Sequence, residues 1–342
     1  MTDDASTRPV SRRDLVRRGA LGLAGVAAAS QALRAAERGL PGSVSPHGAH
    51  EPGNAVGQGR VSDASIDPMV FLEQFDGGEV SRDAAGRTVR EFHLTAVDRD
   101  IEVAPGVFYA AWTYNGQVPG PTLRATEGDL VRVHFRNRGT HAHTIHFHGI
   151  HAARMDGVFE VVHPGDNFVY EFEAKPFGLH LYHCHAVPLK KHIAKGLYGT
   201  FLVDPRTPRP AAREMVMVLN GFDTNFDGEN EVYAVNTVPF AYHHEPIVVR
   251  RGELQRIYMI NLLEFDLINS MHLHGNFFHV YRTGTKLAPD EFTDTLMFCQ
   301  GERHILEFAY EETGRFMFHA HQSEFAELGW MGLLDVVERV IA

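Results

Sequence analysis

The sequence has 342 residues, of which 44% are hydrophobic and 22% charged, and its formal net charge is −11. This length and composition suit a globular protein with two domains of ordinary size. The acidic balance excludes nucleic acid as a partner, because binding to phosphates needs a basic surface. The 22 histidines are the compositional outlier.

The N-terminal segment has the features of an export signal. The stretch SRRDLV from Ser11 to Val16 resembles a twin-arginine motif, and an apolar run from Gly19 to Ser30 follows it. We predict a twin-arginine export signal over residues 1–32, cleaved near Ala29 or Ala32, and a periplasmic or extracellular protein. The run is too short and too rich in Ala and Gly to span a membrane, so we expect no span in the mature chain. The alternative is a disordered basic N-terminus of a cytoplasmic protein.

The rest of the chain divides into a linker and two domains. Residues 33–65 are rich in Gly, Ser, Ala and Pro, which predicts a flexible linker. Residues 66–205 form the first predicted domain, with half-buried strands around Val89–Val97 and Val131–Phe135. A proline-rich connection from Asp204 leads to the second predicted domain, residues 206–342.

The two predicted domains repeat one plan. The motif HFHG at His146 matches HLHG at His272, and GLHLYHCH at Gly178 matches GRFMFHAH at Gly314. Neither half shows sustained helical periodicity. We therefore predict an all-β protein in which each half is a small antiparallel β-sandwich of Greek-key type.

The segment His183-Cys184-His185 lies at the centre of the pattern. On a strand, Cys184 points to one face and the two histidines point to the other. This geometry suits one metal on the thiolate side and a second metal group on the imidazole side. Three further His-x-His pairs begin at His146, His272 and His319. A single pair is typical of a polar strand face or a zinc site, but four pairs indicate a larger metal centre.

The ligand types narrow the choice of metal. Imidazole with thiolate favours copper over calcium or magnesium, which prefer oxygen ligands, while zinc accepts the same groups and stays open. With Cys184 among metal ligands, we expect no disulfide to Cys299. Because Cys299 lies in the apolar run LMFCQ, we predict a buried thiol there.

The four histidine pairs together resemble the multicopper oxidases, in particular their two-domain, laccase-like members. The stretch from Tyr114 to Thr122, YNGQVPGPT, is similar to the start of the family's first domain, and the resemblance covers roughly residues 66–342. It implies that each domain has the cupredoxin fold.

A blue, type 1 copper site is predicted in the first domain only. His143, Cys184 and His192 supply the His2Cys ligand set of such a centre, and Leu197 occupies the axial position without coordinating. The aligned positions of the second domain hold no such ligands. They are Asn269, Ala320, Phe325 and Trp330.

The resemblance assigns the other eight imidazoles to a trinuclear copper cluster that binds dioxygen, so that four coppers are expected per protomer. Two histidines would hold the type 2 copper, namely His146 and His272. Six would hold the type 3 pair, namely His148, His183, His185, His274, His319 and His321. Half of the ligands come from each domain, and in two-domain relatives these domains belong to neighbouring chains. We therefore expect a homotrimer with the cluster between protomers.

The expected reaction is one-electron oxidation of phenolic, aromatic amine or metal-ion donors, coupled to four-electron reduction of dioxygen to water. This reduction consumes protons, and Asp156 and Glu324 are the candidate acids. One alternative is a copper-containing nitrite reductase, which needs only three imidazoles at its type 2 copper and an Asp in place of His146. The other is a non-catalytic copper-handling protein.

Overall fold

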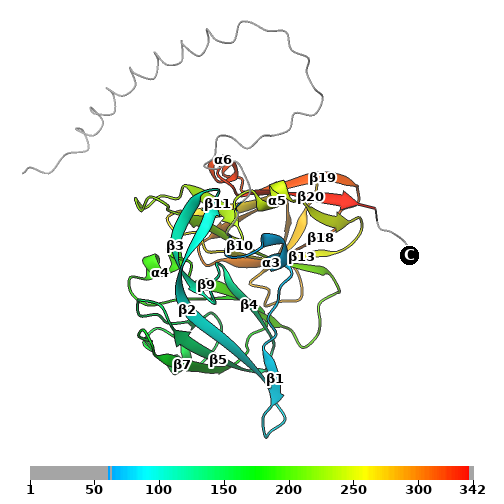
Figure 1. The fold of residues 1–342 in the computed structure, drawn as a ribbon. Helices are drawn as coiled ribbons and strands as arrows, with labels where there is room; N and C mark the ends of the chain where they lie inside the picture. The colour runs from blue at the N-terminus through cyan, green and yellow to red at the C-terminus, as the bar shows by residue number, and fades with distance from the viewer. Residues whose placement is uncertain (1–60, 62–63, 339–342) are drawn as a thin grey trace, which may run out of the picture. The chain divides into compact units, whose positions relative to one another are not determined.

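The computed structural model describes residue 61 and residues 64–338 (Figure 1). The predicted export signal and nearly all of the predicted linker lie outside these residues. The described residues belong to one compact unit. None of the helices in this described part has the length and apolar character that crossing a membrane requires.

Nine strands between residues 79 and 204 form two sheets, which we call domain 1. One sheet has the order β1-β2-β5-β7, with β3 also paired to β2, and consists of Glu79–Arg82, Thr88–Ala104, Leu130–Asn137, Asn167–Glu173 and Val107–Tyr114. The other has the order β4-β9-β8-β6 and consists of Gly120–Thr126, Tyr198–Asp204, Gly178–His183 and His146–Phe147. The helical segments are α3 (Pro68–Leu72), η1 (Ala153–Met155) and α4 (Leu189–Ala194).

Domain 2 repeats this two-sheet plan between residues 213 and 337. One sheet has the order β11-β10-β13-β18-β15-β16 and consists of Val232–Val235, Arg213–Phe222, Gln255–Asn261, Arg303–Phe308, Phe278–Arg282 and Glu291–Thr293. The other has the order β12-β20-β19-β14-β17 and consists of Ile247–Arg250, Met331–Val337, Gly314–His319, Ile268–Leu273 and Thr295–Cys299. Two short helices complete it, α5 (Ala241–His244) and α6 (Ser323–Glu327). The predicted all-β class with two cupredoxin-like sandwiches is confirmed.

The sheets differ from the prediction in strand direction. Each of the four contains one parallel pair, namely β2-β5, β4-β9, β10-β13 and β12-β20. The remaining neighbours are antiparallel. The parallel partners are far apart in sequence and joined through other strands, so no hairpin forces them to run in opposite directions.

Alternating side chains build the core of each sandwich. In β5, Val131, Val133 and Phe135 are buried while the residues between them are not, which is the period of two expected of a half-buried strand. The two sheets of domain 1 meet through aromatic contacts, such as Phe172 of β7 against Phe201 of β9, whose ring centroids are 6.0 Å apart.

A second apolar core joins the two domains. In β10, Met215, Met217 and Leu219 pack into the core of domain 2, whereas Val216 and Val218 pack into a cluster that also contains residues of domain 1. Both faces of β10 are therefore buried, and the strand is accordingly a nearly continuous apolar run.

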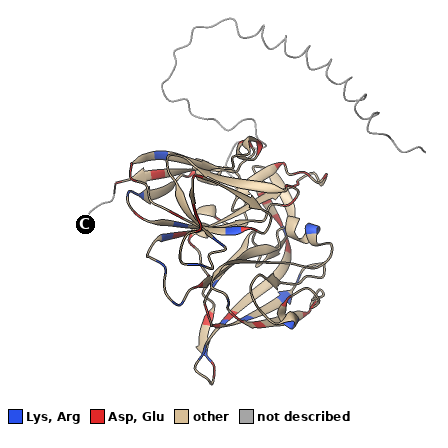
Figure 2. Cartoon of the chain, turned by 180° about the vertical axis from the view of Figure 1, so that it is seen from behind, with Lys and Arg blue, Asp and Glu red and all other residues tan. Residues whose placement is uncertain are grey.

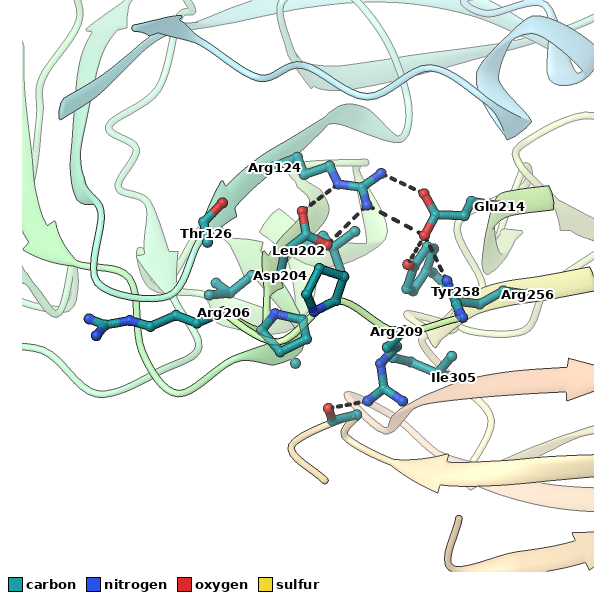
Figure 3. Close-up of a pocket in the computed structure, with 15 residues that line it drawn as sticks. Arg124, Thr126, Leu202, Asp204, Arg206, Arg209, Glu214, Arg256, Tyr258 and Ile305 are labelled. Carbon is teal, nitrogen blue, oxygen red and sulfur yellow. Dashed lines mark hydrogen bonds and ion pairs between the residues drawn. The ribbon is translucent and has the colours of Figure 1, made fainter. Parts of the chain in front are cut away.

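Charged residues also connect the domains. Figure 3 shows a chain of alternating charges beside a cavity of about 350 Å³, formed by Asp204, Arg124, Glu214 and Arg256. Glu307 is the final partner of Arg256. Successive members are 2.7, 2.7, 3.1 and 2.6 Å apart. Arg124 and Asp204 belong to domain 1 and the others to domain 2, so the pair of Arg124 with Glu214 crosses the boundary.

Elsewhere Lys and Arg are interleaved with Asp and Glu along the described chain (Figure 2). In domain 1, for example, Arg132 of β5 pairs with Glu91 of β2 and Glu171 of β7, its neighbours in the sheet.

The prediction that Cys299 is buried was wrong. The side chain is exposed at the end of β17, where Leu296 and Phe298 point inward and the residues between them point outward. An apolar run on a strand with one exposed face still alternates, and Cys299 falls on the outward face.

Candidate metal centres

The predicted type 1 residues converge inside domain 1. Cys184 follows β8, His143 lies in the loop before β6, and His192 lies in α4. The Cys184 Sγ atom is 3.1 Å from His192 Nδ1 and 3.9 Å from His143 Nδ1, and the two Nδ1 atoms are 3.2 Å apart. All three side chains are buried. Two ring nitrogens and a sulfur that face one another can direct their lone pairs to a single point, as the ligands of one shared metal ion do.

The electrostatics of this group fit copper. Burial lowers the pKa of His143 and of His192 to about 4, so at neutral pH both imidazoles are uncharged and keep a lone pair for a metal. Burial also raises the pKa of the Cys184 thiol, so a bound cation would be needed to hold it as a thiolate. Two imidazole nitrogens and one sulfur form a ligand set that copper accepts.

Leu197 is held next to this group by the backbone. Its carbonyl accepts a hydrogen bond from the Cys184 N–H at 3.0 Å, and its own N–H donates to the His192 carbonyl at 3.3 Å. The side chain is fully buried and shares the domain 1 core with Cys184. The backbone of the predicted axial residue is thus hydrogen-bonded to two of the three predicted type 1 ligands.

A first cluster of imidazoles lies at the end of β8. His146, His148 and His183 have ligand nitrogens within 4.8 Å of one another, and His148 Nε2 is 3.3 Å from His183 Nε2. The His185 ring lies beside them, with its centroid 5.5 Å from that of His146. Backbone carbonyls orient two rings, because His146 Nδ1 donates to Asp156 O at 2.7 Å and His183 Nδ1 to Cys184 O at 2.9 Å. Each Nε2 is thereby left free to bind a metal.

Domain 2 holds a matching cluster. His272, His274 and His319 have ligand nitrogens within 4.8 Å, and His274 Nε2 is 2.9 Å from His319 Nε2. The His321 ring centroid is 5.5 Å from that of His272. Backbone carbonyls again accept hydrogen bonds from Nδ1. His272 Nδ1 donates to Asp294 O at 2.9 Å, and His319 Nδ1 donates to Ala320 O at 2.6 Å. The two domains therefore present the same orienting hydrogen bonds.

The structure does not merge the two clusters within one chain. Among the described residues, each group of potential ligands draws its imidazoles from a single domain.

The two candidate acids have different positions. Asp156 Oδ1 lies 3.2 Å from His146 Nδ1 and 4.0 Å from His151 Nε2. Glu324 is exposed on α6 and belongs to neither imidazole cluster. His151, which the sequence analysis did not select, also donates from Nε2 to Phe147 O at 2.8 Å. Its only sequence signal is its position three residues after His148, outside any His-x-His pair.

Comparisons with known proteins agree with this architecture. Two sequence profiles described as multicopper oxidase match residues 97–208 and 208–340. A solved structure titled as a multicopper oxidase is 55% identical, with a TM-score of 0.79 over 80% of this chain and 98% of that one. A copper nitrite reductase from Nitrosomonas europaea is 26% identical, with a TM-score of 0.67 over 73% of this chain and 94% of that one.

A curated relative, the copper-containing nitrite reductase of Neisseria meningitidis serogroup A, is 30% identical over 249 residues, which are 67% of this chain and 64% of the relative. The chain thus spans slightly less than two thirds of the length of the curated nitrite reductases that it matches.

Proposed function

The chain belongs to the multicopper oxidase family, and from this premise we propose that it is a laccase-like oxidase. It would couple one-electron oxidation of a small donor to four-electron reduction of dioxygen to water. The observation that carries this choice is the complete imidazole cluster of domain 2, in which His272, His274 and His319 converge with His321 beside them. A nitrite reductase has no use for both full clusters and would carry Asp in place of His146.

Each predicted copper has a defined set of donors on this chain. His143, Cys184 and His192 would hold the type 1 copper, and the eight paired imidazoles would hold one type 2 and two type 3 coppers. When bound, copper supplies the capacity to take up and pass on single electrons and to bind dioxygen. The rest of the proposal concerns what the protein's own residues do.

Cys184 connects the two kinds of site. One peptide bond joins it to His183 and another to His185, and its carbonyl also accepts the hydrogen bond from His183 Nδ1. A continuous bonded path therefore leads from the buried thiol to the imidazole cluster. Asp156 supplies the proton-holding group beside His146, because reducing one dioxygen to two waters consumes four protons.

We assign the two clusters of one chain to two different trinuclear sites in a homotrimer. The separation of the clusters within one chain supports this assignment. So do exposed apolar side chains next to each cluster, namely Ile150 in domain 1 and Phe277 and Phe292 in domain 2, which are 48–63% exposed. Large exposed apolar groups around an open site are typical of a surface that a partner covers. The predicted signal over residues 1–32 would carry the protein out of the cytoplasm by the twin-arginine route.

Oxygen uptake by the copper-loaded protein tests the function. We expect uptake with phenolic donors, a copper content of four per chain, and no reduction of nitrite under anaerobic conditions. Nitrite reduction with a copper content of two would establish the nitrite reductase alternative. Copper binding without turnover of either acceptor would establish the non-catalytic alternative.

A further inference from the structure

A cavity of about 540 Å³ lies directly beside the predicted type 1 site. His192 forms part of its wall. The other lining residues come from β3, the loops on either side of β6, and the segment after β8, and they include Trp112, His141, Phe159, Val187 and Lys191.

The walls of this cavity are apolar and aromatic. The Trp112 side chain is only 7% exposed, and its ring centroid lies 4.8 Å from that of His192 and 4.4 Å from that of His141. Phe159 and Val187, by contrast, are 84% and 89% exposed. The inner wall therefore consists of indole and imidazole rings, and the rim carries exposed apolar side chains. Such a cavity favours a flat aromatic ligand.

The charged residues of the cavity narrow the class of ligand further. Among the residues that line it there is no Asp, Glu, Met or Cys, and the one Lys or Arg is Lys191. Its ammonium lies 5.2 Å from the centroid of the Trp112 ring, on the side of the cavity where the indole is. His141 Nδ1 lies 2.9 Å from Thr140 Oγ1, and His141 is the one imidazole of the cavity lining outside the predicted copper ligands, so a metal ion would find a single nitrogen ligand here. A cuprous or ferrous ion would find neither the thioether or thiolate groups nor the carboxylates that such ions prefer.

We propose that this cavity binds planar phenolic donors that carry a negatively charged ring substituent, such as a carboxylate or sulfonate, and that it disfavours metal cations. This inference rests on the proposed oxidase function and names its substrate class. Each phenolic donor loses one electron and one proton, so four donors and one dioxygen give four aryloxyl radicals and two waters. Lys191 attracts the anion, and the rings of Trp112 and Phe159 enclose its aromatic part.

Two inert ions with the same ring and opposite charge test the site. Benzenesulfonate and phenyltrimethylammonium are titrated into the copper-loaded protein by calorimetry, and each is tested as an inhibitor of donor oxidation. We expect benzenesulfonate to bind about tenfold more tightly, because one ammonium group favours the anion and opposes the cation.

Neighbouring residues provide matched variants. Lys191→Gln should weaken benzenesulfonate binding about fivefold, whereas Lys190→Gln, whose ammonium lies over the Phe265 ring and outside the cavity, should leave it unchanged. Phe159→Ala should weaken both ions several-fold, since it removes an aromatic contact without a buried partner to disturb. Equal affinity for the two ions, or equal effects of the two lysine variants, would overturn the assignment.

The outcomes also separate this inference from the proposed function. Oxygen uptake that runs faster with ferrous or cuprous ions than with anionic phenols, and is unaffected by Phe159→Ala, would reject the cavity's role and leave the oxidase standing. Absence of uptake with every donor, while benzenesulfonate binds as described, would reject the oxidase and leave the binding site standing.

Discussion

The indole N–H of Trp330 donates a hydrogen bond to Asn269 Oδ1 at 3.0 Å, and both side chains are buried. In the repeat, Trp330 aligns with Leu197 and Asn269 with His143. Where domain 1 brings together a thiol and two imidazoles, domain 2 therefore has a large ring and an amide that satisfy each other. The positions that hold type 1 donors in domain 1 are thus occupied in domain 2 by a buried hydrogen-bonded pair.

Replacing Cys184 by Ser should abolish the thiolate-to-copper absorption in the visible spectrum and the oxidase activity, because a hydroxyl is a poor substitute for a soft thiolate. Copper content should fall from four to three per chain while the far-UV circular dichroism stays the same. Cys299→Ser is the matched control, since this exposed thiol lies in domain 2 and should be dispensable. A blue and active Cys184→Ser protein would refute the type 1 assignment.

Leu197→Met should lower the reduction potential of the type 1 copper, since a thioether donor stabilises the cupric state. Redox titration of the visible absorption measures the shift. Leu181→Met, at a buried position in the core that joins the domains, should leave the potential unchanged. If both variants match the unmodified protein, Leu197 does not face the metal.

Activity should return when two inactive variants are mixed. His148→Ala damages the domain 1 cluster and His272→Ala damages the domain 2 cluster. In a trimer with sites between chains, random co-assembly of equal amounts would give about a quarter of the sites two undamaged halves. Co-refolding with copper, followed by oxygen uptake, measures the recovery. Background activity in mixed trimers of proven composition would show that each site forms within one chain.

Acid should destabilise the protein through two buried histidines outside the predicted ligand sets. Burial lowers the pKa of His180 and of His304 to about 4, below the ordinary value of 6.5. The unfolded chain therefore binds more protons than the folded one between these two values, and the free energy of unfolding falls as pH drops through that window. Each histidine contributes a slope of at most about 1.4 kcal/mol per pH unit.

Urea unfolding of the copper-loaded protein at a series of pH values measures this slope. His304→Phe should reduce this slope by the contribution of one proton, because the variant removes one titrating group and keeps an aromatic ring packed against Phe298. Identical slopes before and after the substitution would mean that His304 does not titrate in this range.

Arg124→Met should destabilise the protein by about 2 kcal/mol, because Asp204 and Glu214 would then face each other without their shared cation. The expected loss of stability is smaller than that for a fully buried ion pair, because Arg124 is partly exposed to solvent. Arg315→Met, which removes an exposed pair with Asp335, should change the stability much less than Arg124→Met does. Denaturant unfolding of both variants makes the comparison.

The sequence predicted local features better than long-range ones. The strand expected over Val131–Phe135 is the centre of β5, and the His-x-His pairs mark the residues that converge in each domain. Local alternation and ligand chemistry are sufficient for these predictions. The parallel strand pairs depend on contacts between distant segments, and the position of Cys299 depends on which face of β17 the core covers. A short run of residues does not determine either the strand pairing or the orientation of Cys299.

The contacts of His151 and of Trp330 were beyond prediction for the same reason. His151 lies near Asp156 because a loop folds back on itself, and the Trp330 hydrogen bond needs β20 and β14 to lie on either side of β19. A sequence motif identifies the candidate ligand atoms, whereas the tertiary fold determines which neighbouring groups orient them.

The burial of β10 on both faces bears on whether either domain could be stable by itself. A free-standing domain 2 would expose Val216 and Val218 to water, together with Tyr258 and the carboxylate of Glu214 that now pairs with Arg124. Such a fragment would have an apolar stripe on a sheet surface, and Glu214 beside it would keep Arg256 but lose its ion pair with Arg124. We therefore expect the two halves to fold together despite their repeated plan, so that a cut in the linker near Pro208 should yield two insoluble fragments rather than two working domains.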